Sequence, residues 1–333
     1  MTSKAEKGGG SFAGLRLLLC ENPLPPLPEA IGAAREELPR SNHYTEAHSA
    51  PLRRLLAQMI EVPEPLIHIN AGSEIILRQI FDRLGRRTHL LTPTYALFPE
   101  IAGRYTETRL SPDHDFRFDL AGLEIPAGTT LAVIVNPNNP NGLSFNVDVL
   151  PRLLDRHPET MFLVDEAFIG LAGQSVVGLV PRYANLIVTR TFSKADSLAG
   201  FRVGYAVLPP ALADDLNAHN DAYPLARPSE AAALATLRNG DKIRERVAAL
   251  RRWTDELAAG LRAFGVRTFP TEGYFFLADF APHDAGRLAD RLRERRILVK
   301  PLADARLGTG FMRVTTALPD DNTRFLSVLR ELI

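Results

Sequence analysis

The stretch TRTFSKADSLAGFRVGY, residues 189–205, directly follows the apolar run NLIV and concentrates polar chemistry in a short segment. Its only lysine, Lys194, has the hydroxyls of Thr191 and Ser193 before it and Arg202 eight residues after it. Ala199 and Gly200 between them are small enough to let the chain turn back. Thr189 is expected to be no more than part of the strand. The pattern indicates a ligand-binding loop at the end of a buried strand.

The apolar runs around this segment predict an α/β domain with a mostly parallel sheet, because strands alternate with helices and show little polar alternation. The expected strands are 66–70, 88–92, 131–135, 161–165, 186–189 and 203–208, and the expected helices are 50–60, 73–84, 95–104 and 147–156.

Beyond residue 228 the pattern changes to a smaller α+β domain. A helical tract at 229–265, broken near Asn239-Gly240, precedes strands at 274–280, 297–300 and 311–316 and helices near 284–295 and 320–333. We therefore predict an N-terminal arm at 1–45, a large domain at 46–225 and a small domain at 226–333, with a linker at 221–228. Within the arm, residues 1–12 are expected to be a flexible lead-in, and ENPLPPLP at 21–28 an extended stretch.

Composition favours a globular protein without a nucleic-acid or membrane footprint. The chain has 333 residues, 45% of them hydrophobic, and a formal net charge of zero. Its apolar runs are too short for a membrane span, and the first residues lack the apolar core of a signal peptide. The only cysteine, Cys20, allows no internal disulfide, which fits a cytoplasmic location. The histidines show no metal-ligand spacing.

The predicted strands end in polar side chains, and ligands of open α/β sheets bind at such ends. Gly72 and Ser73 follow the first strand and begin a helix, whose free N–H groups suit a phosphate. Tyr95 follows the second strand, and an Asn-rich loop that includes Asn139 follows the third. Asp165 ends the fourth strand, where a buried acid is costly unless it is paired with a cation.

Hydroxyls, helix N–H groups, an aromatic ring, an amide, a carboxylate and one lysine together suit a flat cationic ring that carries a phosphate and an aldehyde. Pyridoxal phosphate has these properties, and a buried carboxylate keeps its ring nitrogen protonated.

These segments resemble the class I/II aminotransferases of fold type I, which depend on pyridoxal phosphate, and within them histidinol-phosphate aminotransferase and threonine-phosphate decarboxylase. The resemblance runs from about Glu21 to the C-terminus. It rests on seven pieces in the family's order: ENPLPPLP, AGSE, PTYALF, NPNNPNG, VDEAF, RTFSKADSLAGFRVGY and FMRVT.

The resemblance implies a role for each matching residue. Lys194 would form a Schiff base with the cofactor and then move protons, Asp165 would pair with the ring nitrogen, Asn139 would bind the ring oxygen, and Tyr95 would stack on the ring. Several groups would hold the cofactor phosphate: the backbone of Gly72 and Ser73, the side chains of Thr191, Ser193 and Arg202, and Tyr44 of a neighbouring subunit in a homodimer. Arg313 would bind the substrate carboxylate, and Asn22 would lie on an arm covering the substrate.

Departures from the family pattern fall on the substrate side. Phe168 stands where a tyrosine is usual, Asn141 where a threonine is usual, and Gly273-Tyr274 where a small residue and an asparagine are usual. Lys300 stands where the family often has an arginine near the substrate tail, and Arg227 stands at a linker position that is more often small. Lys300 and Arg227 could bind an anionic tail on the substrate.

The leading interpretation is an aminotransferase that moves an amino group between an amino acid or amino-phosphate-type donor and a keto acid. A decarboxylase of the threonine-phosphate type is the alternative, since both reactions start from the same complex and the phenylalanine form at 168 is similar to that branch. A third possibility, a ligand-sensing domain of a transcription regulator, is disfavoured because no basic recognition element is visible before the first expected helix. The identity of the substrate stays open.

Overall fold

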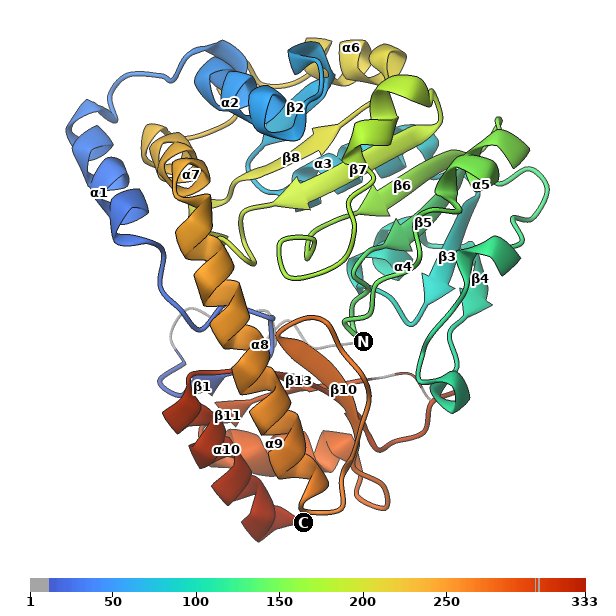
Figure 1. Ribbon diagram of the computed structural model, residues 1–333, viewed down its shortest axis with the longest axis vertical. Coiled ribbons are helices and arrows are strands. Elements are labelled where there is room, and N and C mark those ends of the chain that lie inside the picture. Colours follow the sequence, from blue (N-terminus) through green and yellow to red (C-terminus); the bar gives the residue numbers. More distant parts are fainter. Residues whose placement is uncertain (1–11, 303, 305) are drawn as a thin grey trace.

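The chain is described by a computed structural model that covers residues 12–302, 304 and 306–333, so most of the expected lead-in at 1–12, and with it the start of the predicted arm, lies outside the described residues. A seven-stranded sheet forms the centre of the upper part in Figure 1, in the order β2-β8-β7-β6-β5-β3-β4. Its strands are β2 (Ile67–Asn70), β3 (Thr88–Thr92), β4 (Tyr105–Arg109), β5 (Leu131–Val135), β6 (Met161–Asp165), β7 (Leu186–Thr191) and β8 (Gly204–Val207).

Most neighbouring strands of this sheet run parallel, and only β8 runs antiparallel to β2 and β7. The predicted α/β fold with a mostly parallel sheet is therefore confirmed. β3 and β5 are buried at every position, as expected for strands covered on both faces. The strand β4 was not predicted, because at the edge of the sheet it carries the polar sequence YTETR and is largely exposed.

Helices cover the sheet and extend the upper part. They are α1 (Pro28–Glu37), α2 (Ala50–Ile60), α3 (Ser73–Leu84), α4 (Leu97–Ala102), α5 (Leu150–Arg156), α6 (Pro210–Ala218) and α7 (Arg227–Arg238). Short 3₁₀ helices lie at Leu38–Arg40, Ala47–Ser49, Glu64–Leu66, Pro112–His114, Leu120–Gly122, Val177–Arg182 and Ala199–Phe201.

Two of the helices correct the sequence interpretation. α1 begins at Pro28, the last residue of the stretch expected to be extended, because proline is well tolerated in the first turn of a helix. α6 was not predicted either, and the expected linker is shorter than proposed because α7 already begins at Arg227.

The C-terminal part contains a four-stranded antiparallel sheet in the order β12-β13-β10-β9. Its elements are α8 (Gly240–Arg262), β9 (Arg267–Thr268), β10 (Phe275–Asp279), α9 (Ala285–Glu294), β11 (Ile297–Leu298), β12 (Lys300–Pro301), β13 (Phe311–Thr315) and α10 (Pro319–Leu332). The predicted break near Asn239-Gly240 is confirmed, and the expected strand at 297–300 divides into β11 and β12. The N-terminal β1 (Leu15–Arg16) pairs in parallel with β11.

The long helix α8 runs from the upper part into the lower part (Figure 1). Its first half contributes Val247 and Leu250 to the large hydrophobic cluster around the central sheet, and its second half contributes Leu257 and Leu261 to a smaller cluster. The smaller cluster also takes in Leu15 and Leu17 from the N-terminal arm. The proposed domain boundary near residue 225 stays a prediction.

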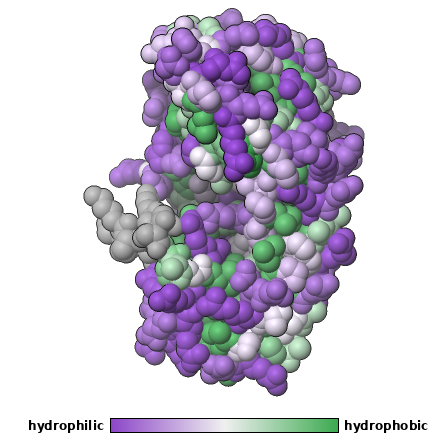
Figure 2. Space-filling view, turned by 90° about the vertical axis from the view of Figure 1, so that its left-hand side faces the viewer, coloured by the Kyte–Doolittle hydropathy of each residue, from purple (hydrophilic) through white to green (hydrophobic). Residues whose placement is uncertain are grey.

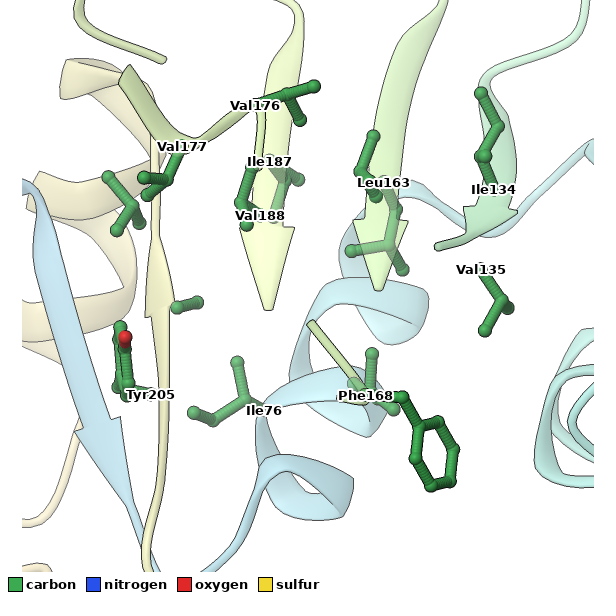
Figure 3. Packing of buried hydrophobic residues seen from close by; sticks show 14 of the residues in the cluster. Ile76, Ile134, Val135, Leu163, Phe168, Val176, Val177, Ile187, Val188 and Tyr205 are labelled. Atoms are coloured by element: carbon green, nitrogen blue, oxygen red, sulfur yellow. The ribbon is translucent and has the colours of Figure 1, made fainter. Parts of the chain in front are cut away.

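Aliphatic side chains from neighbouring strands fill the space between the sheet and its helices. Figure 3 shows Leu163 of β6 beside Ile187 and Val188 of β7, with Ile76 of α3 below them. The face in Figure 2 is mostly hydrophilic, with hydrophobic residues in small separate groups. Within the described ranges, no helix is both long and apolar enough to cross a membrane.

Leu163→Ala should lower the free energy of unfolding by about 2–5 kcal/mol, because it leaves a cavity in the middle of the core. Leu163 is 0% exposed, whereas Leu38, at 58% exposed, provides a matched control. Leu38→Ala should change stability by less than about 0.5 kcal/mol. Urea unfolding of both variants measures the difference, and equal losses would contradict this placement of the core.

Candidate functional site

The carboxyl ends of β3, β5, β6 and β7 meet at one edge of the central sheet, where the chain faces the C-terminal part (Figure 1). The predicted residues Tyr95, Asn139, Asp165 and Lys194 lie in the segments that follow these strands or, for Asp165, at the last position of one. The sheet therefore gathers on one edge side chains that are far apart in the sequence.

Lys194 lies in the loop after β7 and points toward the N-terminal arm. Its Nζ donates hydrogen bonds to the carbonyl oxygens of Leu19 and Cys20 at 3.0 and 3.1 Å. It also lies 5.3 Å from the ring centroid of Phe168. Burial lowers the pKa of the Lys194 ammonium. A lysine with a lowered pKa more easily becomes the neutral amine that nucleophilic and base chemistry require.

Asp165 is buried at the end of β6 with no cationic side chain bonded to it in the described chain. Its Oδ1 accepts a hydrogen bond from Thr189 Oγ1 at 2.9 Å. Burial raises its pKa to about 6, although the bonds from Thr189 and from the backbone N–H of Ala167 act in the opposite direction. A buried carboxylate held by neutral donors is poised for a cationic ligand group.

Gly72, Ser73, Thr191, Ser193 and Arg202 come together where α3 begins beside β7 and β8. Gly72 has φ +91°, and a Cβ there would collide with the guanidinium of Arg202. Thr191 Oγ1 donates to Ser193 Oγ at 3.0 Å and accepts from the backbone N–H of Ser193 at 3.1 Å. Hydroxyls, a guanidinium and a helix N-terminus in one place form a cradle suited to a phosphate.

Arg202 occupies this cradle in a left-handed backbone conformation, with φ +54°. Such conformations are costly for residues other than glycine and are often retained at functional sites. Its Nη1 donates to the carbonyl oxygen of Ala199 at 3.3 Å, in the turn that the small residues were expected to allow.

Arg313 on β13 is buried, and its Nη1 donates to Asn139 Oδ1 at 2.8 Å. Its Nη2 donates to the carbonyl oxygen of Leu18 in the arm. Its Nε is buried without a hydrogen-bond partner within the described residues. A buried N–H of this kind is costly, so this atom is a candidate donor to a bound carboxylate.

The N-terminal arm crosses the site and contacts the side chains of Lys194 and Arg313. Asn22 Nδ2 donates to the carbonyl oxygens of Lys194 and Ala195 at 3.0 and 3.2 Å, and Tyr274 OH donates to that of Cys20 at 2.7 Å. The expectation that residue 22 lies on an arm over the site agrees with these contacts, while its role toward a substrate stays a prediction.

Aromatic rings form one wall of the site. Phe168 packs edge-on against Phe275 at 4.8 Å between centroids and against Tyr274 at 6.4 Å. Tyr95 packs edge-on against Phe98 at 5.8 Å. Burial raises the pKa of Tyr95 to about 12, so its hydroxyl stays protonated at neutral pH. Phe168 thus belongs to an aromatic cluster with Tyr274 and Phe275 that lies beside Lys194.

Tyr44, Lys300 and Arg227 are three further residues that the sequence analysis proposed for binding. Tyr44 is 75% exposed and stacks on Tyr223 at 4.4 Å, and none of its described contacts involves the residues around Lys194. Lys300 on β12 lies directly opposite Arg313 in the antiparallel ladder, so the two side chains share one face of the sheet. Arg227, considered for an anionic tail, instead pairs with Glu37 at 2.6 Å and donates to the carbonyl oxygen of Tyr44.

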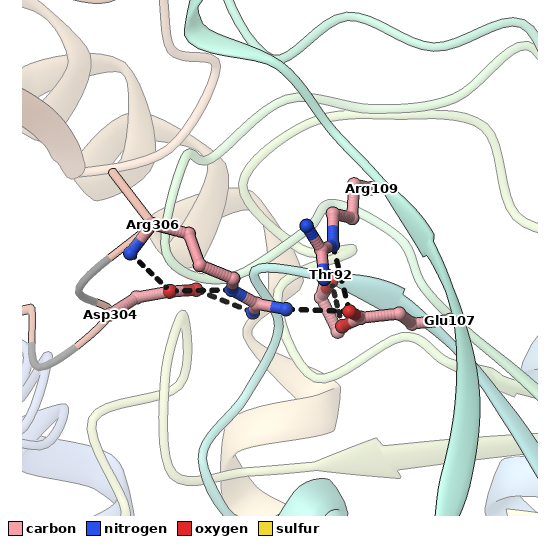
Figure 4. Close-up of polar contacts among 5 residues, drawn as sticks. All are labelled: Thr92, Glu107, Arg109, Asp304 and Arg306. Carbon is pink, nitrogen blue, oxygen red and sulfur yellow. Dashed lines mark hydrogen bonds and ion pairs between the residues drawn. The ribbon is translucent and has the colours of Figure 1, made fainter. Parts of the chain in front are cut away.

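A charged network joins the loop before β13 to the edge of the central sheet (Figure 4). Glu107 on β4 accepts hydrogen bonds from Thr92 at the end of β3, from Arg109 and from Arg306. Arg306 also pairs with Asp304 at 2.7 Å. These contacts tie the C-terminal part to the strand that leads to Tyr95.

Sequence reasoning missed several residues of the site. It gave Thr189 no function beyond the strand, whereas Thr189 holds Asp165, a contact that the pairing of β6 with β7 produces. It also assigned nothing to Glu166 and Arg190, which form a buried ion pair beside Asp165. The carbonyl oxygens of residues 18–20 carry no sequence signal, because every residue type has one.

Residues 17–327 of the chain match the family described as aminotransferase class I and II. Histidinol-phosphate aminotransferase 1 of Pseudomonas aeruginosa is 33% identical over 322 residues, which cover 94% of this chain and 91% of that protein. The protein of the same name from Bordetella parapertussis is 34% identical over 335 residues, with 96% and 92% covered.

Solved structures share the fold. The histidinol-phosphate aminotransferase of Sinorhizobium meliloti in complex with pyridoxal-5'-phosphate superposes with a TM-score of 0.86 at 25% identity, covering 96% of this chain and 92% of that one. The L-threonine-O-3-phosphate decarboxylase of Porphyromonas gingivalis superposes with a TM-score of 0.84 at 22% identity, covering 96% and 99%. The second likeness concerns the fold alone. The predicted fold-type I architecture is confirmed.

Asp196→Asn should stabilise the protein above neutral pH and have little effect in acid. Burial raises the pKa of Asp196 to about 7 from its ordinary 3.8, its own backbone N–H and the nearby Arg190 opposing the rise. Between pH 4 and pH 7 the folded chain therefore retains a proton that the unfolded chain has released, and stability falls as the pH rises through this window.

Melting temperatures of the wild type and the Asp196→Asn variant at pH 5 and pH 8 test this expectation. The melting temperature of the variant, relative to that of the wild type, should be higher at pH 8 than at pH 5. A constant difference in melting temperature between the two proteins would contradict the raised pKa of the partly buried Asp196.

Proposed function

The chain belongs to the class I and II aminotransferases and is a pyridoxal phosphate-dependent aminotransferase, and we propose that its amino donor carries an anionic tail besides its reacting amino group. The two relatives described above are both named histidinol-phosphate aminotransferase 1. We therefore infer an amino-phosphate-type donor and a keto acid acceptor. The observation that carries the proposal is the position of Lys300 directly opposite Arg313.

The residues present fit the cofactor. The cradle at Gly72, which a side chain would fill, suits its phosphate, with Ser73, Thr191, Ser193 and Arg202 as donors. Asp165 suits the cationic ring nitrogen, since it is buried and bonded only to neutral donors in the described chain. Tyr95 and Asn139 would contact the ring and its oxygen. Each of these residue roles is part of the proposal.

Pyridoxal phosphate, when bound, supplies an electron sink that stabilises negative charge on the substrate carbon. Lys194 would hold the cofactor covalently, and its Nζ would then take up and return protons at the substrate carbon. Its lowered pKa supports this use, because the neutral amine is the form that accepts a proton. Asp165 would keep its negative charge next to the ring nitrogen, and the wall formed by Phe168 and Phe275 would exclude water.

Arg313 and Lys300 would bind the charged groups of the substrate. The antiparallel register places the Lys300 side chain beside Arg313, so one substrate could present its carboxylate to Arg313 and its anionic tail to Lys300. The buried Nε of Arg313, which has no hydrogen-bond partner among the described residues, could donate to such a group. Asn22, on the arm that crosses the site, would help to enclose the substrate.

A decarboxylase is the second candidate. Phe168 favours it, because a phenylalanine at this position removes a hydroxyl that the aminotransferase pattern usually offers to the cofactor and leaves an apolar wall beside Lys194. Release of carbon dioxide from L-threonine O-3-phosphate, without transfer of its amino group to the cofactor, would favour this candidate over the first.

We also propose a cytoplasmic homodimer with shared sites. Tyr44 and Tyr223 form an exposed aromatic pair, and a second subunit could cover it and receive Tyr44 at its own cofactor phosphate. Next to Tyr44, the hydroxyl of Thr45 is buried without a hydrogen-bond partner within the described residues, which a second subunit could supply.

Lys300→Met should reduce kcat/KM for L-histidinol phosphate by about ten- to a hundredfold, because it removes a charge-assisted hydrogen bond. The rate with L-histidinol, which lacks the phosphate, should stay nearly unchanged. The change in cofactor absorbance during the amino-donor half-reaction measures both rates.

Lys242→Met serves as the matched control, since Lys242 pairs with Glu29 on the surface of α8. It should leave both donors unaffected. Equal losses for the two donors in the Lys300 variant would refute the proposed contact with the anionic tail.

Mixing inactive Lys194→Ala and Tyr44→Ala subunits should restore activity if sites are shared. Each mixed dimer then contains one site with a wild-type lysine and a wild-type tyrosine from the other subunit. Activity is measured after the two variants have been mixed and refolded together. If the mixture is no more active than the sum of its components although mixed dimers form, Tyr44 does not act across a subunit interface.

A further inference from the structure

The last residue of β6, Asp165, and the residue after it, Glu166, bond to two consecutive residues of β7, Thr189 and Arg190. Asp165 lies beside Thr189 in the parallel ladder, and the backbone N–H of Glu166 donates to the carbonyl oxygen of Thr189 at 2.8 Å. Thr189 and Arg190 are successive strand residues, so their side chains point to opposite faces. Thr189 bonds Asp165, and Arg190 bonds Glu166.

The Glu166 side chain is 0% exposed, and three donors bond to its carboxylate. Its Oε1 accepts from the backbone N–H of Val176 at 2.7 Å, and its Oε2 accepts from Ser175 Oγ and from Arg190 Nε at 2.9 and 2.8 Å. Both oxygens of the carboxylate therefore accept hydrogen bonds. A change in the backbone conformation of the turn after β6 would break the buried ion pair between Glu166 and Arg190.

Arg190 is held as firmly as Glu166. Its Nη1 donates to Tyr205 OH at 3.2 Å, across the antiparallel pair of β7 with β8, and its Nη2 donates to Ser175 Oγ. The charge of Arg190 also lowers the pKa of Asp196, which lies two residues after Lys194 in the loop that follows β7.

The charges around Asp165 make this pair relevant to the reaction. Glu166 and Lys194 act on the Asp165 carboxyl in opposite directions, Glu166 raising its pKa and Lys194 lowering it. Without Arg190, the full negative charge of Glu166 would stand uncompensated one residue from the group that would hold the cofactor ring.

We propose that Glu166 and Arg190 are positioning residues that hold Asp165 and set the electrostatic potential at the bound cofactor from the far face of the sheet. This inference rests on the proposed role of Asp165 toward the ring nitrogen. Glu166 fixes the turn that carries Ala167, whose N–H bonds Asp165, and Phe168, which contacts Lys194. Arg190 balances the charge of Glu166.

The test is the pH at which the visible absorbance of the bound cofactor changes in the intact holoenzyme. Arg190→Met removes a positive charge, so this midpoint should rise by about one pH unit, and the dissociation constant of the cofactor should rise about tenfold. Glu166→Gln alone removes a negative charge, so its midpoint should fall. The double variant Glu166→Gln/Arg190→Met should return the midpoint to that of the wild type.

Two outcomes overturn the proposal: a wild-type midpoint in both single variants, or an equal shift in the Arg190→Met and double variants. The second outcome would mean that packing, and not charge, is responsible. If Arg190→Met does not fold, Glu166→Gln and Arg190→Lys decide the question. Arg190→Lys should keep the wild-type midpoint, and Glu166→Gln should lower it. An unshifted midpoint in Glu166→Gln then overturns the proposal.

Two further variants separate this inference from the proposed function. Arg295→Met removes the arginine of an exposed ion pair with Glu331 and should leave the midpoint unchanged. Asp165→Asn should disturb the absorbance and weaken cofactor binding if Asp165 meets the ring nitrogen. Normal behaviour of Asp165→Asn would refute that role, whereas an altered Asp165→Asn with wild-type Arg190 and Glu166 variants would refute the positioning pair alone.

Discussion

The structure depends on the burial of two consecutive carboxylates at the end of β6. Moving a carboxylate out of water is costly, and the chain meets this cost differently for each residue. Among the described residues, Glu166 bonds to an arginine and two further donors, whereas Asp165 bonds to a hydroxyl and a backbone N–H but to no cation. Arg190 therefore compensates the charge of Glu166, while Asp165 could accept the cationic ligand group proposed above. The extended backbone of the strands makes this division possible, since successive side chains of a strand point to opposite faces of the sheet.

The site is complete only when three distant parts of the chain meet. The sheet edge supplies Asp165 and Lys194, the C-terminal part supplies Arg313, and the arm supplies the carbonyl oxygens that bond to Lys194 and Arg313. Because the arm also forms β1 beside β11, its position over the site is coupled to the packing of the C-terminal part. Substrate entry must exchange at least some of these carbonyl contacts for substrate contacts, because they occupy the same donors that would bind it.

Much of the fold and of the cofactor side could be predicted from the sequence. Buried strands such as 131–135 read as continuous apolar runs, and the polar residues directly after them must lie at the same sheet edge. The remainder depends on pairing between distant segments. The bond of Thr189 to Asp165 follows from the register of β6 with β7, and the bond of Tyr274 to the arm joins residues 254 positions apart. α1 escaped prediction because its proline-rich approach suggested an extended chain, although proline also suits a first helical turn.

The same reasoning explains why the substrate specificity is harder to predict from the sequence than the cofactor chemistry. The groups that fit the cofactor follow strands of one sheet, so the order of the motifs in the sequence indicates where these groups lie. The groups on the substrate side come from short strands and loops, where one register decides which charge faces the site. Arg227 illustrates this, since its charge is taken up by Glu37 and cannot be read from the sequence as part of the site. Lys300 illustrates the opposite case, because a two-residue strand places it opposite Arg313. A shift of that strand by one residue would turn the Lys300 side chain to the other face of the sheet, away from Arg313.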